Sequence, residues 1–186
     1  MKSFDRVGVE IPLLYINPPY NADSSIICSV SEAGGLGIVD HVTAGPACFT
    51  VPAHTAHGVR LRLDALHDRS WDPDEKLAVL PLENWEAISN LASQSLASIP
   101  VPVFVEVGNR IQAVAAINAG ATGLIARGNE GPGWVSETSG LVLLQEIIDL
   151  SDVPVFLQGG VSPRTARAAI AAGAAGVVLD VHLTLA

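Results

Sequence analysis

The sequence predicts an α/β fold built on a parallel sheet, because one pattern of residues occurs twice in the second half of the chain. The first copy runs from Val101-Pro102-Val103-Phe104 to Ala119-Gly120-Ala121-Thr122-Gly123. The second copy runs from Val153-Pro154-Val155-Phe156 to Ala172-Gly173-Ala174-Ala175-Gly176. Each copy reads as an apolar strand, a turn, a helix ended by glycine and the start of another strand. This is a βαβ unit, and its repetition predicts a barrel or an open sheet of parallel strands.

The barrel is favoured because the whole chain holds eight apolar runs of strand length, with helical patterns between several of them. A (β/α)8 TIM barrel needs eight parallel strands of this kind, surrounded by helices. The expected strands are Val7 to Ile16, Leu36 to Asp40, Val59 to Leu63, Leu77 to Leu80, Val103 to Val107, Thr122 to Ala126, Val155 to Leu157 and Gly176 to Leu179.

Amphipathic spacing and capping residues predict the outer helices. Three helices are indicated by the apolar sets Ile26, Ile27, Val30 and Ala33, then Trp85, Ile88, Leu91 and Leu96, then Leu141, Leu144, Ile147 and Ile148. The expected capping residues are Asn109 and Ser162 at N-termini, Pro163 at the first helical position, and Gly34, Gly120 and Gly173 at C-termini.

The expected barrel is trimmed, since its 186 residues are fewer than the roughly 250 typical of the fold. The segments from Asp40 to Val59 and from Leu63 to Lys76 contain Thr, Gly, Pro and Asp and do not read as full amphipathic helices. We therefore expect short or absent helices after strands two and three, and no final helix. Because missing helices expose apolar strand faces, residues 1–186 are expected to be one domain of a longer polypeptide, with further domains or a partner chain over the trimmed side.

Composition disfavours several kinds of partner. Ten Lys and Arg against nineteen Asp and Glu give a net charge of −9, which disfavours nucleic acid and anionic membrane surfaces. The N-terminal apolar run is broken by Glu10 and Pro12 and has no signal-peptide cleavage site. The two cysteines have neither metal nor redox spacing, so we expect a cytoplasmic protein.

The segment Gln158-Gly159-Gly160 follows the seventh expected strand, where barrels of this class commonly bind phosphate. Two glycines allow backbone N–H groups to approach an anion, and the helix that begins at Pro163 directs its positive end to the same place. The alternative is that these glycines only form a tight turn.

The loop after the sixth strand offers a second candidate site. Arg127, Glu130 and Trp134 provide charge and a stacking surface in a glycine-rich segment, so we expect them to face a ligand, although a solvated polar loop is the alternative. Glu106 on the fifth strand is a third candidate, either facing the barrel mouth or pairing with Arg62 or Arg127 for structure alone.

No metal site is expected. His54 and His57 have the spacing His-x-x-His, but no carboxylate or cysteine accompanies them as a further ligand.

Several motifs, in order along almost the whole chain, resemble the nitronate monooxygenase (2-nitropropane dioxygenase) family of FMN-dependent barrels. They are Glu32-Ala33-Gly34-Gly35-Leu36-Gly37, Gly128-x-Glu130-Gly131, Gln158-Gly159-Gly160-Val161 and the Ala-Gly-Ala-x-Gly before the last strand. The resemblance implies FMN as cofactor, with Gln158, Gly159 and Gly160 at its phosphate and with Asn17 and Gly128 near its ring. It also implies that Arg127 and Glu130 face a small-molecule or acyl substrate as catalytic residues.

The chain departs from the family pattern at three places. Trp134 stands where the family has a histidine that serves as catalytic base, Asp180-Val181 replaces a Gly-Thr pair, and Ile16-Asn17-Pro18 replaces Ala-Pro-Met. The chain is also similar to the nitronate-monooxygenase-like domain of large polyketide or fatty-acid synthases.

Three interpretations of function follow. The first is an FMN-dependent oxidoreductase of the nitronate monooxygenase or enoyl reductase type. The second is a degenerate, non-catalytic barrel that acts as a structural or docking domain in a synthase. The third is a barrel that acts on a phosphate-bearing substrate as an isomerase or lyase.

Overall fold

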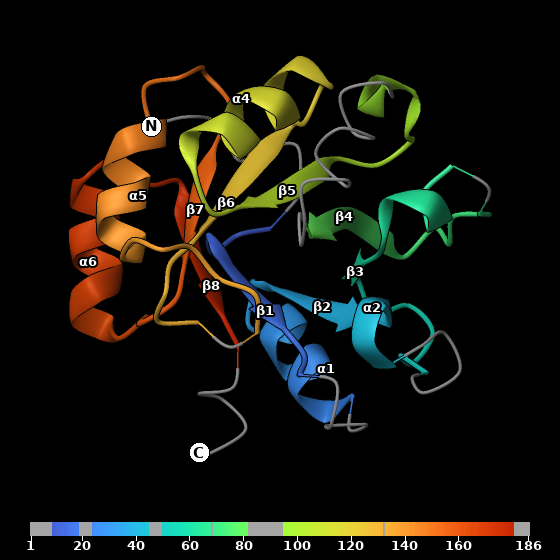
Figure 1. Cartoon of the computed structure of the whole chain (residues 1–186). Helices are drawn as coiled ribbons and strands as arrows, with labels where there is room; N and C mark the ends of the chain where they lie inside the picture. Colours follow the sequence, from blue (N-terminus) through green and yellow to red (C-terminus); the bar gives the residue numbers. More distant parts are fainter. Residues whose placement is uncertain are drawn as a thin grey trace.

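In the computed structural model, eight parallel strands form a closed barrel in which each strand pairs with the next and β8 pairs with β1 (Figure 1). The structure describes residues 9–18, 24–44, 50–67, 69–81, 95–131 and 133–180. The strands are β1 Leu13–Ile16, β2 Leu36–Asp40, β3 His57–Arg60, β4 Glu75–Pro81, β5 Val103–Val107, β6 Gly123–Arg127, β7 Val155–Gln158 and β8 Gly176–Leu179. The predicted (β/α)8 TIM barrel is confirmed.

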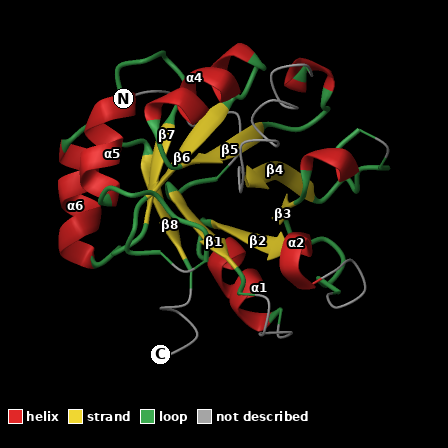
Figure 2. Cartoon of the chain, in the orientation of Figure 1, coloured by secondary structure: helices red, strands yellow, loops and turns green. Residues whose placement is uncertain are grey.

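The helices lie outside the strands (Figure 2). They are α1 Ser25–Glu32, α2 His41–Ala44, α4 Arg110–Asn118, α5 Gly140–Ile147 and α6 Pro163–Ala171, with short 3-10 turns η1 Leu63–Ala65 and η2 Leu96–Ser98. After β2 there is a helix of only four residues, and after β3 a turn of three, so the predicted trimming is confirmed at both places. Most of the helix expected around Trp85, and the chain after the last strand, lie outside the described residues. None of the described helices combines the length and apolar character needed to cross a membrane.

The expected boundaries of β2, β5 and β8 are confirmed, whereas those of β3 are wrong by two residues at the start and three at the end. We expected Val59 to Leu63, and the strand runs from His57 to Arg60. The reason is that the side chain of Arg60 is buried against carboxylates inside the barrel, while that of Arg62 points to solvent and pairs with Asp64. The alternation of apolar and basic residues here does not reveal which arginine lies inside.

The predicted helix caps are confirmed. Asn109 accepts a hydrogen bond from the backbone N–H of Gln112, and Ser162 forms a capping box with Thr165 ahead of Pro163. Left-handed glycines end three of the helices at the expected positions, with φ of 93° at Gly34, 92° at Gly120 and 97° at Gly173.

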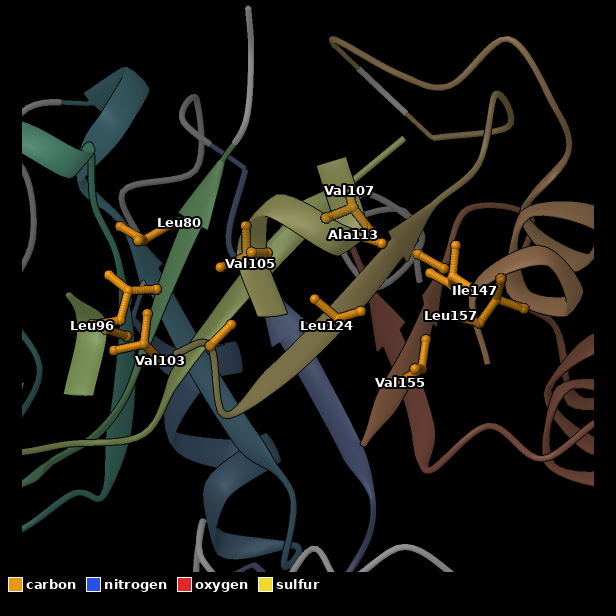
Figure 3. Close-up of a cluster of buried hydrophobic side chains, with 14 of the residues drawn as sticks. Leu80, Leu96, Val103, Val105, Val107, Ala113, Leu124, Ile147, Val155 and Leu157 are labelled. Atoms are coloured by element: carbon orange, nitrogen blue, oxygen red, sulfur yellow. The ribbon is translucent and has the colours of Figure 1, made fainter. Parts of the chain in front are cut away.

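An apolar layer joins the strands to the helices on one side of the barrel (Figure 3). It brings Val105 and Leu124 of the barrel against Ala113 of α4 and Ile147 of α5, all almost fully buried. Burial of each larger side chain contributes about 2 kcal/mol. On the trimmed side, Val59 of β3 is buried in the same cluster as Leu66, which lies in the loop after η1. Loop residues therefore cover part of the surface from which helices are trimmed.

The interior of the barrel explains why the βαβ unit repeats its phenylalanine and its last glycine. Phe104 is the register partner of Gly123, and Phe156 is the register partner of Gly176. A Cβ on Gly123 would lie 2.4 Å from the ring of Phe104, and one on Gly176 would lie 2.3 Å from the ring of Phe156. The two rings, with centroids 5.5 Å apart, fill the centre of the barrel. Because each glycine has no side chain, it leaves the space that the neighbouring ring occupies.

This packing predicts that Gly123→Ala destabilises the fold by about 1–3 kcal/mol, since the new methyl group overlaps the ring of Phe104. Phe104→Leu in the same chain should relieve the overlap, so that the double variant loses less stability than the sum of the two single variants. Denaturant unfolding of the three variants measures the difference. Additive losses would contradict the explanation.

Candidate active site at the barrel mouth

Four charged side chains meet inside the barrel at the carboxyl ends of the strands. Asp40 and Arg60 are the last residues of β2 and β3, Glu106 is the penultimate residue of β5, and Arg127 is the last residue of β6. Because side chains alternate along a strand, these positions continue the inward-facing rows below them, such as Leu36 and Ile38 in β2. In (β/α)8 barrels this end carries the active site.

The four side chains form one hydrogen-bonded network, called here the mouth network. Arg60 donates from Nη1 to both oxygens of Asp40, at 3.2 and 3.1 Å. It also donates from Nε to Oε1 of Glu106 at 3.0 Å and from Nη2 to Oε2 at 2.9 Å. Arg127 donates from Nη1 to the same Oε2 at 2.8 Å. The network therefore joins β2, β3, β5 and β6.

Burial makes these contacts strong. Burial alone would raise the pKa of Glu106, but the charges of Arg60 and Arg127 and their hydrogen bonds hold that pKa below its ordinary value. Burial alone would lower the pKa of Arg60, and the two carboxylates raise it overall. Arg60 and Glu106 are thus both charged at neutral pH, and Glu106 is a weak base.

The sequence predicted only part of this network. The expected pairing of Glu106 with Arg127 is confirmed, and the alternative with Arg62 is wrong. Asp40 and Arg60 were missed. The available signal was a charged residue at the carboxyl end of an apolar strand, and it was obscured at Arg60 by the misplaced end of β3.

The loops after β6 and β7 bring together six of the seven residues predicted for the site: Arg127, Gly128, Glu130, Gln158, Gly159 and Gly160. Arg127 is the register partner of Gln158, and the N–H of Gly128 donates to the carbonyl of Gln158 at 2.9 Å. Oε2 of Glu130 accepts a hydrogen bond from the N–H of Gly140 at 3.0 Å, at the start of α5. The same oxygen would lie 3.3 Å from a Cβ on Gly159. Glu130 thus ties its loop to the beginning of a helix.

Gly159 and Gly160 form a cradle suited to an anion. Their φ angles are 103° and 60°, a left-handed pair that glycine adopts without strain. Within the described part of the chain, neither of their N–H groups donates to a protein acceptor. Consecutive backbone N–H groups of this kind bind phosphate and other anions.

Gln158 lies next to the cradle and is nearly fully buried, at 2% exposure. Among the residues that the structure describes, its Oε1 has no hydrogen-bond partner, and its Nε2 lies 3.5 Å from Oδ2 of Asp180, which is itself buried. A buried acceptor without a donor is costly, so a ligand N–H at the mouth would satisfy it.

Asn17 is the predicted site residue that lies apart from the others. Its Oδ1 accepts a hydrogen bond from the hydroxyl of Tyr15 at 3.0 Å. Tyr15 packs with Ile27 of α1 and Val39 of β2, in a cluster on the outside of the barrel. The side chain of Asn17 is therefore turned toward this outer cluster.

A small pocket, with an enclosed space of about 10 Å³, opens between the ends of β5 and β6. Glu106 and Arg127 line it together with Trp134, which is half exposed. Its remaining walls are Pro81, Val107, Gly108, Val135 and Ser136. The predicted loop residue Trp134 thus does lie beside Arg127.

The two histidines with His-x-x-His spacing have separate roles. The backbone N–H of His54 donates to Asp74 at 2.8 Å, while Nδ1 of His57 lies 2.9 Å from the carbonyl of Thr55. Among the described residues, no group of three or more His, Cys, Asp or Glu could hold a metal ion.

Comparison with models of known protein families finds no match. Two curated relatives carry the same name, (3aS,4S,5R,7aS)-5-hydroxy-7a-methyl-1-oxo-octahydro-1H-indene-4-carboxyl-CoA dehydrogenase. The one from Rhodococcus jostii is 28% identical, and the one from Mycobacterium tuberculosis is 25% identical. Each alignment covers 97% of this chain and 54% of the relative. The chain therefore spans about half the length of the curated relatives it matches.

Solved structures share the fold at lower identity. FabK from Thermotoga maritima superposes with a TM-score of 0.74 at 23% identity, over 97% of this chain and 61% of FabK. Nitroalkane oxidase from Streptomyces ansochromogenes gives 0.67 at 18% identity, over 92% and 65% of the two chains. A mandelate oxidase gives 0.71 at 16% identity, over 97% and 68%.

The mouth network predicts a large stability cost for Glu106→Gln, about 3–5 kcal/mol at pH 7, because Arg127 and Arg60 lose their shared buried counter-charge. The folded-state pKa of Glu106 is lower than that of the unfolded chain, which is about 4.3. The charged carboxylate therefore stabilises the fold above about pH 5, and this contribution is lost as the pH falls through the folded-state pKa.

Denaturant unfolding between pH 7 and pH 3 measures the difference between the wild type and Glu106→Gln. The difference should shrink in acid. Asp64→Asn is the control, because it removes a carboxylate from an exposed arginine pair and should change stability little at any pH. A cost at Glu106 as small as that of the control would contradict the assignment.

Proposed function

We propose that this chain is an FMN-dependent oxidoreductase domain of the nitronate monooxygenase or enoyl reductase type. The observation that carries the proposal is the pair of left-handed glycines, Gly159 and Gly160, with two N–H groups available to an anion at the carboxyl end of β7. This is the end of the barrel at which phosphate groups bind in this fold.

The residues present fit a flavin mononucleotide in two respects. Gly159 and Gly160 would hold its phosphate, and a Cβ at either position would face Glu130 and crowd the cradle. Gln158 would accept a hydrogen bond from the ring, since its buried Oε1 needs a donor. Gly128 was predicted to lie near the ring, but Glu130 and Gly140 fill the space beside it, so we propose that it instead lets the loop pack against the start of α5. When bound, the flavin supplies hydride and electron transfer.

The protein's own groups would bind and orient the substrate. Arg127 would contact it from the floor of the pocket, and Trp134 would pack over it and exclude water. Glu130 was predicted as a second catalytic residue. A direct role would need its carboxylate to leave the N–H of Gly140, so we propose that it mainly fixes the loop that carries Trp134.

The similarities support the same reading. FabK, the nitroalkane oxidase and the mandelate oxidase share the fold, and two of them are named as oxidases. The curated relatives are named as dehydrogenases of a carboxyl-CoA compound, which favours an acyl thioester as substrate for this chain too. We also propose that the chain is one domain of a larger synthase and that neighbouring domains or a partner chain pack against the barrel.

A second candidate function is a structural or docking barrel that has lost its cofactor. The observation that favours it is Asp180, a buried carboxylate beside Gln158 at the end of β8. Together with Glu130 it places negative charge near the cradle, and like charges weaken phosphate binding.

The visible spectrum separates the two functions. Purified protein, or protein reconstituted with FMN, should absorb near 450 nm and release FMN on denaturation. Gly159→Ala should lower FMN affinity by roughly tenfold or more, since its methyl group would press on Gly131 and Glu130 and shift the backbone that forms the cradle.

Gly173→Ala is the matched control for backbone strain. Gly173 has φ of 97°, close to the 103° of Gly159, but it lies at the end of α6 against Ile148. This variant should lose similar stability and keep its FMN. A wild-type protein that stays colourless after reconstitution would rule out the flavin function and leave the docking barrel.

A further inference from the structure

The pocket between β5 and β6 has apolar walls and a charged floor. Val107, Val135 and Trp134 supply wall surface, and Arg127 with Glu106 forms the floor. Ser136 also lines the pocket, but its hydroxyl donates to the carbonyl of Gly108 at 2.6 Å and lies 3.0 Å from the hydroxyl of Thr138. The pocket residues that remain to recognise a polar group of a ligand are therefore Arg127 and Glu106.

The charges of this floor are already balanced. The two guanidinium groups of Arg60 and Arg127 face the two carboxylates of Asp40 and Glu106 in one buried network. The next charged group along the mouth, Asp180, is a third carboxylate. A ligand that brought a negative charge to Arg127 would also meet the charge of Glu106, and the four residues of the mouth network would offer that anion no surplus positive charge.

Binding of a neutral carbonyl group does not add a buried negative charge. Its oxygen accepts a hydrogen bond from a guanidinium without changing the net charge of the network, and its carbon chain contacts the apolar walls. The enclosed space of about 10 Å³ admits a group about the size of one water molecule, which suits a carbonyl oxygen and not a ring system.

We propose, building on the oxidoreductase function above, that this pocket selects substrates bearing an uncharged carbonyl, such as an acyl thioester, and rejects carboxylates and nitronate anions. Glu106 is the specificity-determining residue, because its charge lies in the pocket and neutralises Arg127. Loss of that charge leaves the floor net positive and admits anions.

The test uses crotonamide and crotonate, which have the same shape and differ in charge, with propane-2-nitronate as a third probe. Each is titrated into the protein while the indole N–H resonance of Trp134, assigned with Trp134→Phe, is followed by NMR. The wild type should bind crotonamide at least tenfold more tightly than either anion. Equal binding, tighter binding of an anion, or no response of Trp134 to any probe would overturn the proposal.

Two variants assign the selectivity. Glu106→Gln should reduce or reverse the preference for crotonamide. Asp40→Asn is the matched control, since it removes the same charge from the network at a residue that does not line the pocket, and it should weaken the preference less than Glu106→Gln does. If Glu106→Gln does not fold, the affinities of the wild type for crotonamide and for the two anions still test the proposed selectivity. If both variants change selectivity equally, the assignment to Glu106 is wrong.

The titrations require neither turnover nor cofactor, so they separate this inference from the proposed function. A colourless protein that still prefers crotonamide would refute the flavin function and keep the selectivity. A yellow protein that binds crotonate and crotonamide equally tightly would support the flavin function and refute the selectivity.

Discussion

A closed barrel of eight strands has an interior of fixed size that side chains must fill, and this constraint organises the whole molecule. The chain meets it with two different layers. The middle is apolar, with the rings of Phe104 and Phe156 placed over Gly123 and Gly176. The mouth is ionic, with Arg60 between Asp40 and Glu106. The first layer sets how closely neighbouring strands approach, and the second ties the strand ends that form the site.

An ionic layer is an expensive way to fill a barrel, because each charge loses its hydration. Apolar residues of the same volume would stabilise the barrel at least as well. Here each carboxylate and each guanidinium has a partner at hydrogen-bond distance, so the layer is tolerated. Its position at the functional end of the barrel, and not in the middle, suggests that it is kept for what it does to a ligand and not for stability.

The features that could be predicted from the sequence are those encoded locally. The repeated βαβ unit, the caps at Asn109 and Ser162 and the left-handed glycines each depend on a few adjacent residues. The mouth network depends on residues far apart in the chain. Arg60 lies 20 residues from Asp40 and 46 from Glu106, and only the closure of the barrel brings them together. An error of three residues in the expected end of β3 left Arg62 as the candidate in place of Arg60.

The ionic mouth also bears on the kind of chemistry the site can perform. An isomerase or lyase moves protons and needs a group whose pKa lies near neutrality. Glu106 is held ionised by two guanidinium groups and accepts protons poorly, and the described residues that line the pocket include no histidine. Among the described pocket residues the remaining polar groups are the paired Arg127 and the hydrogen-bonded Ser136. Such a site can bind and orient a substrate but has little to offer proton transfer, which favours chemistry supplied by a bound cofactor over the isomerase or lyase reading.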